Sequence, residues 1–466
     1  MFHISTRGEA LPSGFMQTML NGLAPDGGLY LPQNWPALSE KTIKGLVGKT
    51  YQETACLVLK ALIEDEISEE ELGDMVESAY SSFRHQAVCP LSQIDSNLFL
   101  LELYHGPTLA FKDLAMQLLG KLMDYALKKK GERATIVGAT SGDTGSAAIE
   151  AFRGLEQVDI FILYPHGRVS DVQRRQMTTV KAANVHAIAV NGTFDDCQNI
   201  LKALFNDAAF RREMNLSGVN SINWARVAAQ TVYYFSSALS LGAPDRPVSF
   251  AVPTGNFGDV LAGWVAKKMG LPIECLIIGV NENDILARMY KSGDYALKHV
   301  VPTTSPSMDI QISSNFERLL FENYDRDAAA VNRLMTDLAD RRSFTVSADA
   351  LQRIRNEFFI AGVTEEQVQT EMQQIYQKND FLIDPHTAIG LNVARQWSKE
   401  HPRIPVISLA TAHPAKFPEA VHAATGQYPQ LPKHMEPILH KTEQLTILEN
   451  SKADIAAFIR ETARSS

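Results

Sequence analysis

The sequence has few cysteines and no long apolar run, and each absence excludes a class of protein. Only four cysteines occur among 466 residues, without a CxxC pair or a Cys/His ligand spacing, so we predict neither a metal site nor a disulfide scaffold. No apolar run reaches the roughly 18 residues that a transmembrane helix needs. The opening MFHISTRGEA has no apolar signal-peptide core. We therefore expect a cytoplasmic protein without a membrane partner.

The chain also lacks an excess of positive charge. Its formal net charge is −9, although its hydrophobic content of 45% is ordinary for a folded protein. An acidic chain has no general attraction for nucleic acid, so we predict no such partner. A small anion can still bind wherever local donors gather.

Short apolar runs alternate with amphipathic segments from residue 98 onward. Such runs are typical of parallel strands that are buried on both faces, and the alternation predicts an α/β fold with mainly parallel sheets. The predicted strands are 98–104, 134–140, 159–165, 185–190, 248–254, 274–280 and 406–412. The predicted helices between them include 113–130, 170–182 and 223–241.

Changes in pattern divide the chain into three predicted units. Residues 1–95 form a mostly helical N-terminal unit, residues 96–245 an α/β domain, and residues 246–466 a second α/β domain. The stretch at about 325–380 is charged and helical, without a strong strand, and we interpret it as a peripheral insertion. Ligands of open parallel sheets bind beyond the carboxyl ends of the strands, so polar residues there are candidate site residues.

A glycine-rich turn follows the predicted strand 248–254. It consists of Gly255, Asn256, Phe257, Gly258 and Asp259, and an amphipathic helix comes next. Glycines let several backbone N–H groups approach one ligand, and a helix N-terminus favours an anion. The turn is therefore a candidate phosphate site, although the same pattern also suits a plain strand–turn–helix corner.

A second polar turn follows the predicted strand 134–140. Here Ser141, Asp143 and Thr144 alternate with glycines before a helix. Their hydroxyl groups, together with the N–H groups of the helix start, could hold a carboxylate or a second phosphate. Simple N-capping of the helix is the alternative, but it needs only one of these hydroxyls.

Two further strand ends carry candidate side chains. Lys112 follows an apolar triplet. Burial among these apolar residues would lower the pKa of the amine and prepare it to attack an aldehyde. The neighbouring Asp113 would raise that pKa if its carboxylate faced Lys112. Thr411 lies near the end of the strand 406–412 and could either bond a ring nitrogen or cap a helix.

The candidate sites together describe one ligand. A phosphate, an aldehyde for a lysine and a ring nitrogen together describe pyridoxal 5′-phosphate.

The motifs around these residues also carry a family resemblance. They are STRG (5–8), DGGLYLP (26–32), HGPTLAFKD (105–113), SGDTGSAA (141–148), SINWAR (221–226), GNFGD (255–259), DPHTA (384–388) and ATAHPAKFPEAV (410–421). In these segments the sequence resembles the threonine synthases, which are fold-type II pyridoxal-phosphate enzymes of the tryptophan synthase β family. The match runs over essentially the whole chain.

The resemblance implies a lyase of threonine biosynthesis that converts O-phospho-L-homoserine and water to L-threonine and phosphate. It makes Lys112 the Schiff-base lysine and proton carrier, the 255–259 loop the cofactor-phosphate site, and Thr411 the partner of the pyridine nitrogen. Asp143 lies where family members contact the cofactor 3′-oxygen, and many relatives carry Asn there. The implied substrate pocket consists of Ser141, Thr144, Ser221, Asn223 and Arg226.

Other functions stay open at this point. A phospho-lyase or a dehydratase of the same fold would share the lysine and the glycine-rich loop. A non-catalytic binding protein that kept the fold is a more distant alternative. The sequence leaves the oligomeric state open between a monomer and a homodimer.

Overall fold

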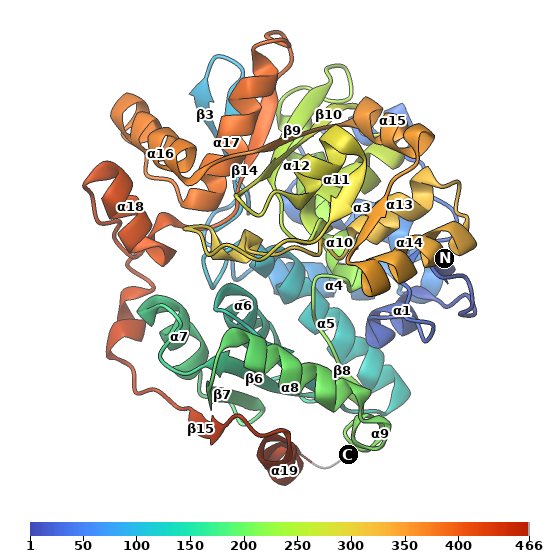
Figure 1. Cartoon of the computed structure of the whole chain (residues 1–466), viewed down its shortest axis with the longest axis vertical. Coiled ribbons are helices and arrows are strands. Elements are labelled where there is room, and N and C mark those ends of the chain that lie inside the picture. The colour runs from blue at the N-terminus through green and yellow to red at the C-terminus, as the bar shows by residue number, and fades with distance from the viewer. Residues whose placement is uncertain (465–466) are drawn as a thin grey trace.

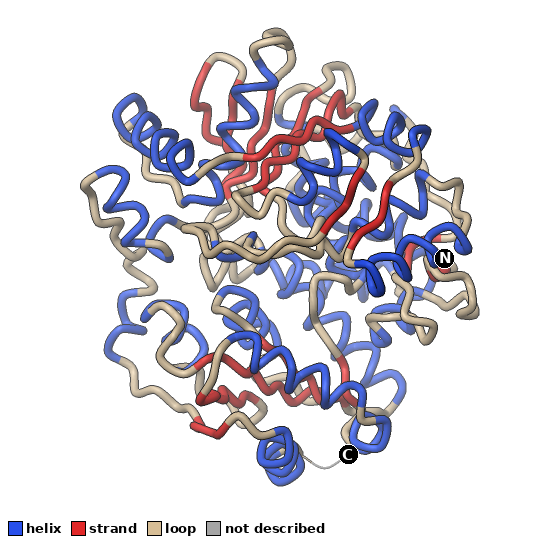
Figure 2. Tube along the Cα trace, in the orientation of Figure 1, coloured by secondary structure: helices blue, strands red, loops and turns tan. Residues whose placement is uncertain are grey.

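Two separate sheets, each surrounded by helices, organise the computed structural model, which describes residues 1–464 (Figures 1 and 2). All seven strands predicted above are confirmed, each within two residues at either end. Two short antiparallel pairs complete the strands, β1 (His3–Ser5) with β2 (Tyr30–Pro32) and β11 (Asp294–Ala296) with β12 (Ser343–Thr345). Across residues 1–464, no helix has the length and apolar character needed to cross a membrane.

The larger sheet has six strands. Their spatial order is β13 (Phe358–Gly362), β10 (Ile273–Val280), β9 (Val248–Pro253), β14 (Val406–Ala410), β4 (Leu98–Glu102) and β3 (Leu91–Asp95). All neighbours are parallel except β3 and β4. Helix α17 (Pro385–Ser398) packs across β9, β10 and β14, and α16 (Glu365–Asn379) packs on α17. Strands β9 and β14 are buried throughout, which explains their nearly continuous apolar sequence.

The smaller sheet has five strands, all parallel. Their order is β15 (Thr446–Glu449), β7 (Val185–Asn191), β6 (Val158–Pro165), β5 (Ala134–Ala139) and β8 (Leu216–Ser217). Helix α8 (Phe194–Asn206) packs on β5 and β6, and α19 (Lys452–Thr462) packs on α8. Figure 1 shows this sheet below the larger one, with the segment after α18 (Pro418–Thr425) descending from one to the other.

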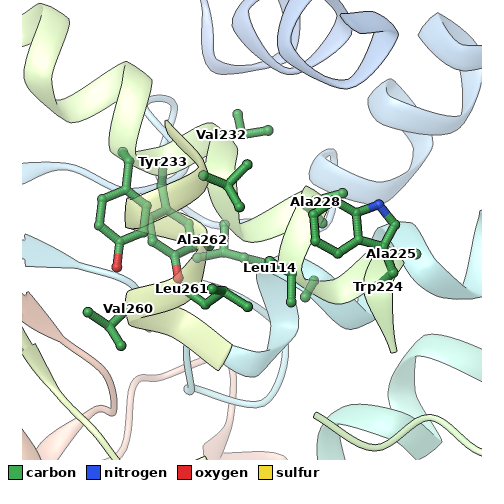
Figure 3. Packing of buried hydrophobic residues seen from close by; sticks show 14 of the residues in the cluster. Leu114, Trp224, Ala225, Ala228, Val232, Tyr233, Val260, Leu261 and Ala262 are labelled. Carbon is green, nitrogen blue, oxygen red and sulfur yellow. The ribbon is translucent and has the colours of Figure 1, made fainter. Parts of the chain in front are cut away.

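Four helices join the two sheets through a common core. Helix α10 (Trp224–Ser240) is buried along nearly its whole length and packs against α11 (Gly258–Lys268), α5 (Lys112–Lys130) and α3 (Tyr51–Ile63). Figure 3 shows side chains of α10, such as Trp224 and Tyr233, beside Leu114 and Leu261. A helix that is buried on nearly every side owes its stability to packing inside such a core.

The N-terminal helices begin at strong capping signals. Thr50 with Glu53 starts α3, and Ser68 with Glu71 starts α4 (Glu69–Tyr80), each by a reciprocal capping box. The remaining α-helices are α1 (Phe15–Asn21), α2 (Glu40–Lys44), α6 (Asp143–Phe152), α7 (Asp171–Thr178), α9 (Ala208–Glu213), α12 (Ile285–Ser292), α13 (Phe316–Asn323), α14 (Ala328–Arg341) and α15 (Ala348–Glu357). Short 3₁₀ turns are η1 (Glu64–Glu66), η2 (Pro306–Met308), η3 (Pro414–Lys416) and η4 (Glu436–His440).

The sheets cross the boundaries of the three predicted units, which remain a proposal. Strand β4, from the middle unit, pairs with β14 of the last unit, and β15 returns from the last unit to the smaller sheet. The expectation that 325–380 holds no strong strand is wrong, because β13 extends the larger sheet beside β10. Its five residues lie between two charged helices, whose pattern dominates the sequence there.

Candidate active site

A cavity of about 820 Å³ lies where strands of both sheets end. It is lined by the residues that follow β5, β9 and β14 and by the start of α5. The predicted site residues that line it are Lys112, Ser141, Asp143, Thr144, Ser221, Arg226, Gly255, Asn256, Phe257, Gly258, Asp259 and Thr411. Segments more than 100 residues apart thus converge at one edge, as the rule for parallel sheets predicts.

Lys112 begins α5 and is only 8% exposed. Its Nζ lies 3.4 Å from Asp143 Oδ2 and 3.4 Å from Ser307 Oγ. Burial lowers the pKa of this amine, and nearby cations lower it further, although Asp143 acts in the opposite direction. Asp113 turns away and accepts hydrogen bonds from the backbone N–H and hydroxyl of Thr108. Asp113 therefore does not face Lys112, and the objection that it would raise the pKa of the amine is removed.

Asp143 is the first residue of α6 and is buried. Burial alone would raise the pKa of its carboxyl, but Lys416 and Lys112 hold that pKa well below the usual range. Lys416 Nζ lies 2.9 Å from Oδ1, and Gln173 Nε2 donates to the same oxygen at 2.7 Å. The carboxylate is thus charged at neutral pH and held from two sides.

The glycine-rich turn forms the N-terminus of α11. Phe257 adopts a left-handed conformation with φ of 63° and immediately precedes the helix. A Cβ added to Gly255 would lie 2.9 Å from the Ser307 carbonyl oxygen, so only glycine fits this close approach. The turn and the first residues of α11 line the cavity, where unpaired helix N–H groups favour an anion.

Asp259 belongs to the same turn but differs chemically from Asp143. Its Oδ1 accepts hydrogen bonds from the hydroxyls of Tyr233 and Tyr234, the second at 2.9 Å. Because no cation compensates it among the described residues, burial raises its pKa to about 6. Its carboxyl therefore anchors α11 to α10 and ionises less readily than that of Asp143.

Arg226 lies in the first turn of α10 with only 4% of its surface exposed. Its Nη1 donates to the Val219 carbonyl oxygen at 3.1 Å. Within residues 1–464, no carboxylate forms a salt bridge with it, and its Nε has no hydrogen-bond partner. Burial lowers its pKa to about 10, so the guanidinium stays charged at neutral pH. A buried, unpaired cation beside a cavity is suited to an anionic ligand.

Asn223 is the one predicted site residue that does not line the cavity. Its Oδ1 accepts the N–H of Ala225 at the start of α10, and its Nδ2 donates to the Met19 carbonyl oxygen at 2.8 Å. Both ends of the side chain are therefore used to cap the helix and to attach it to α1, and its role in the substrate pocket stays a prediction.

Four site residues were missed by the sequence reasoning, namely Gln173, Ser307, His386 and Lys416. Ser307 and His386 line the cavity, and the His386 Nε2 accepts the N–H of Ser307 at 3.3 Å while its Nδ1 lies 2.6 Å from Asp384 Oδ2. His386 and Lys416 belong to recognised motifs, DPHTA and HPAKF, which offered a signal. Ser307 and Gln173 lie outside every motif.

These features fit the group deduced from the sequence. A buried amine of lowered pKa is the partner that an aldehyde requires, and the glycine-bounded N-terminus of α11 suits a phosphate. Thr411 is buried at the end of β14, and its carbonyl oxygen accepts the N–H of Phe111, next to Lys112, at 2.8 Å. The strand end and the lysine are therefore fixed to each other.

Comparison with known proteins identifies the class and then the family. A family model described as pyridoxal-phosphate dependent enzyme matches residues 87–411, and models of the threonine synthase N terminus and C-terminal region match residues 2–80 and 387–459. These matches define a pyridoxal-phosphate enzyme, as predicted. The chain belongs to the threonine synthase family.

Individual relatives agree with this assignment over their whole length. A threonine synthase of Pseudomonas aeruginosa is 48% identical over 99% of this chain and 98% of its own. A crystal structure of a PLP-bound threonine synthase from Brucella melitensis is 56% identical, covers 100% of both chains and has a TM-score of 0.98. The yeast threonine synthase structure is 39% identical, covers 99% and 98%, and has a TM-score of 0.94. The predicted family, fold class and cofactor are confirmed.

Proposed function

We propose that this chain converts O-phospho-L-homoserine and water to L-threonine and phosphate. The observation that carries the proposal is the unpaired, buried guanidinium of Arg226 in the cavity that also holds Lys112. The N-terminus of α11 is available for the cofactor phosphate, so Arg226 provides a second anion site. Any amino-acid substrate brings a carboxylate, which the turn at the start of α6 can hold, so the additional cation of Arg226 favours a substrate that carries a phosphate as well.

The cofactor-binding roles are proposed residue by residue. Lys112 carries the cofactor, the 255–259 loop with the start of α11 holds its phosphate, and Thr411 bonds its ring nitrogen without a charge. Asp143 would contact the 3′-oxygen of the cofactor. When bound, pyridoxal 5′-phosphate withdraws electrons from the substrate and makes its α- and β-protons acidic.

Lys112 moves the protons. Its Nζ would carry one proton at a time: it would accept the α-proton, release that proton to the conjugated system of the bound substrate and cofactor, and only then accept a β-proton, which it would return to carbon after water has added at the β-carbon. The phosphate leaves from the γ-carbon. The lowered pKa of the amine suits this work, because a base must be unprotonated before it can accept a proton. Burial of Lys112 also limits access of water to the reacting atoms.

The substrate groups are assigned by their place around the cavity. Arg226 binds the substrate phosphate, because its planar donors match phosphate oxygens. Ser141 and Thr144, at the start of α6, and Ser221, before α10, supply hydroxyl donors for the remaining oxygens. The cytoplasmic location and the oligomeric state, monomer or homodimer, remain predictions from the sequence.

The test is incubation of the full chain with pyridoxal 5′-phosphate and O-phospho-L-homoserine, with threonine and phosphate measured together. We expect equal amounts of both products. Formation of 2-oxobutyrate with little threonine would favour the dehydratase or phospho-lyase alternative. For Arg226→Met we expect kcat/KM for this substrate to fall by about 100-fold, as for the loss of a charged hydrogen bond of about 3 kcal/mol. An unchanged kcat/KM would refute the assignment of Arg226.

A further inference from the structure

The hydrogen bonds of Asp143 are unequal on its two oxygens. Oδ1 receives the two short contacts, 2.9 Å from Lys416 Nζ and 2.7 Å from Gln173 Nε2. Oδ2 receives two long contacts, 3.4 Å from Lys112 Nζ and 3.5 Å from Ser307 Oγ. The carboxylate is thus held mainly by Lys416 and Gln173, and only weakly by the lysine assigned to the reaction.

Lys416 is deeply buried for a lysine, with only 1% of the residue exposed. Besides Asp143, its Nζ donates to the Thr108 carbonyl oxygen at 2.7 Å and to Gln176 Oε1 at 3.2 Å. Three acceptors satisfy the three donors of an ammonium group. A lysine this deeply buried is retained in the charged form only when it is paired in this way.

We propose that Lys416 is a positioning residue, which occupies Asp143 and thereby prevents it from forming a full ion pair with Lys112. The inference rests on the proposed role of Lys112. Lys416 need not touch the substrate, because it acts through the carboxylate. Without it, Asp143 would retain one cation within reach, Lys112, and would hold that amine as an ammonium ion, which cannot accept a proton.

The charged groups around Lys112 support this view. Asp143 on α6 raises the pKa of Lys112, whereas burial lowers it most, and Lys416 on η3 and Arg226 on α10 lower it as well. Lys416 also lowers the pKa of two other neighbours, Asp113 and His413. Removal of the Lys416 charge eliminates its repulsion of the Lys112 ammonium group and strengthens the attraction between that group and Asp143. Both changes favour a protonated Lys112.

The experiment measures the pKa of Lys112 in the full-length chain freed of cofactor. The rate at which an amine-selective acylating reagent labels Lys112 is followed by peptide mass spectrometry between pH 6 and pH 10. For Lys416→Met we expect the pKa of Lys112 to rise by about one unit, which slows labelling at pH 7 about tenfold. Lys433→Met, at an exposed position of the same C-terminal segment, is the control and should leave the rate unchanged.

The double variant Lys416→Met with Asp143→Asn separates charge from structure. Because it removes the attraction together with the repulsion, we expect the pKa of Lys112 to return toward the wild-type value. Equal pKa values for Lys112 in the wild type and in a folded Lys416→Met chain would overturn the proposal. If Lys416→Met does not fold, the neutral and more polar Lys416→Gln replaces it, with the same expected rise in the pKa of Lys112. An unchanged pKa in that variant would again overturn the proposal.

This test is independent of the product assay. If borohydride fixes the cofactor to a lysine other than Lys112, the proposed function of Lys112 fails, whatever its pKa. If Lys112 carries the cofactor but its pKa is unchanged by the Lys416 substitution, only the positioning role proposed for Lys416 fails.

Discussion

Two buried aspartates occupy nearly the same place in two turns of this protein, yet their surroundings give them opposite chemistry. Asp143 begins α6 after β5, and Asp259 is the second residue of α11 after β9. Lys416 and Lys112 depress the pKa of the first, whereas burial beside two tyrosine hydroxyls raises that of the second to about 6. The position of these aspartates at a helix N-terminus therefore does not determine the pKa of their carboxyl groups. That pKa depends on the side chains that distant segments of the chain place beside them.

The largest effect on activity should come from replacing Lys112, the lysine beside the Asp143 turn. For Lys112→Ala we expect loss of threonine formation and of the borohydride-reducible cofactor link, because no other described lysine lines the cavity at the start of a helix. Product assay and mass spectrometry after reduction measure both. If the cofactor link were retained on another lysine, the comparison of the two turns would fail, because the turn that contains Asp143 would no longer lie beside the reactive lysine.

The second prediction concerns the contribution of the Asp143 carboxylate to the stability of the folded chain. Asp143→Asn leaves Lys416 charged and without its buried partner, so we expect the free energy of unfolding to fall by roughly 4 kcal/mol. Denaturant unfolding of the full chain without cofactor measures this. A loss below about 1 kcal/mol would mean that the pair contributes as little as a surface salt bridge. The double variant with Lys416→Met should recover much of the loss.

The smallest effect concerns Asp259 and depends on pH. Its folded-state pKa of about 6 exceeds the unfolded value of 3.8, so its ionisation costs the folded chain stability as the pH rises from about 4 to about 6. Asp259→Asn stays neutral throughout. The free energy of unfolding of this variant, relative to wild type, should therefore increase across that window by up to about 3 kcal/mol. A difference that is constant with pH would show that Asp259 titrates normally.

Much of this arrangement was predictable from sequence, because it depends on local patterns. Apolar runs located the strands, and the rule that ligands bind at carboxyl strand ends brought Lys112, Asp143 and Thr411 together. The two aspartates were indistinguishable at that level, since both lie among glycines before a helix. What separates them is Lys416 and the pair Tyr233 and Tyr234, which only tertiary packing brings close.

Asn223 carries two local signals at once. It lies in a motif associated with the site, and it also occupies the position where Asn is favoured as an N-cap. The structure uses it for the cap, with Ala225 and Met19 as partners. The local signal for capping was present in the sequence, but the functional interpretation of the surrounding motif concealed it.

The return of β15 to the smaller sheet has a consequence for synthesis of the chain. Strand β7 pairs with β6 on one side and with β15 on the other. Until residue 449 has left the ribosome, β7 presents an open edge, although the rest of its sheet is complete by residue 217. Open edges pair readily with other chains. The last strand and α19 therefore act as a late closure, and chains that stop short of them should aggregate even when every active-site residue is already present.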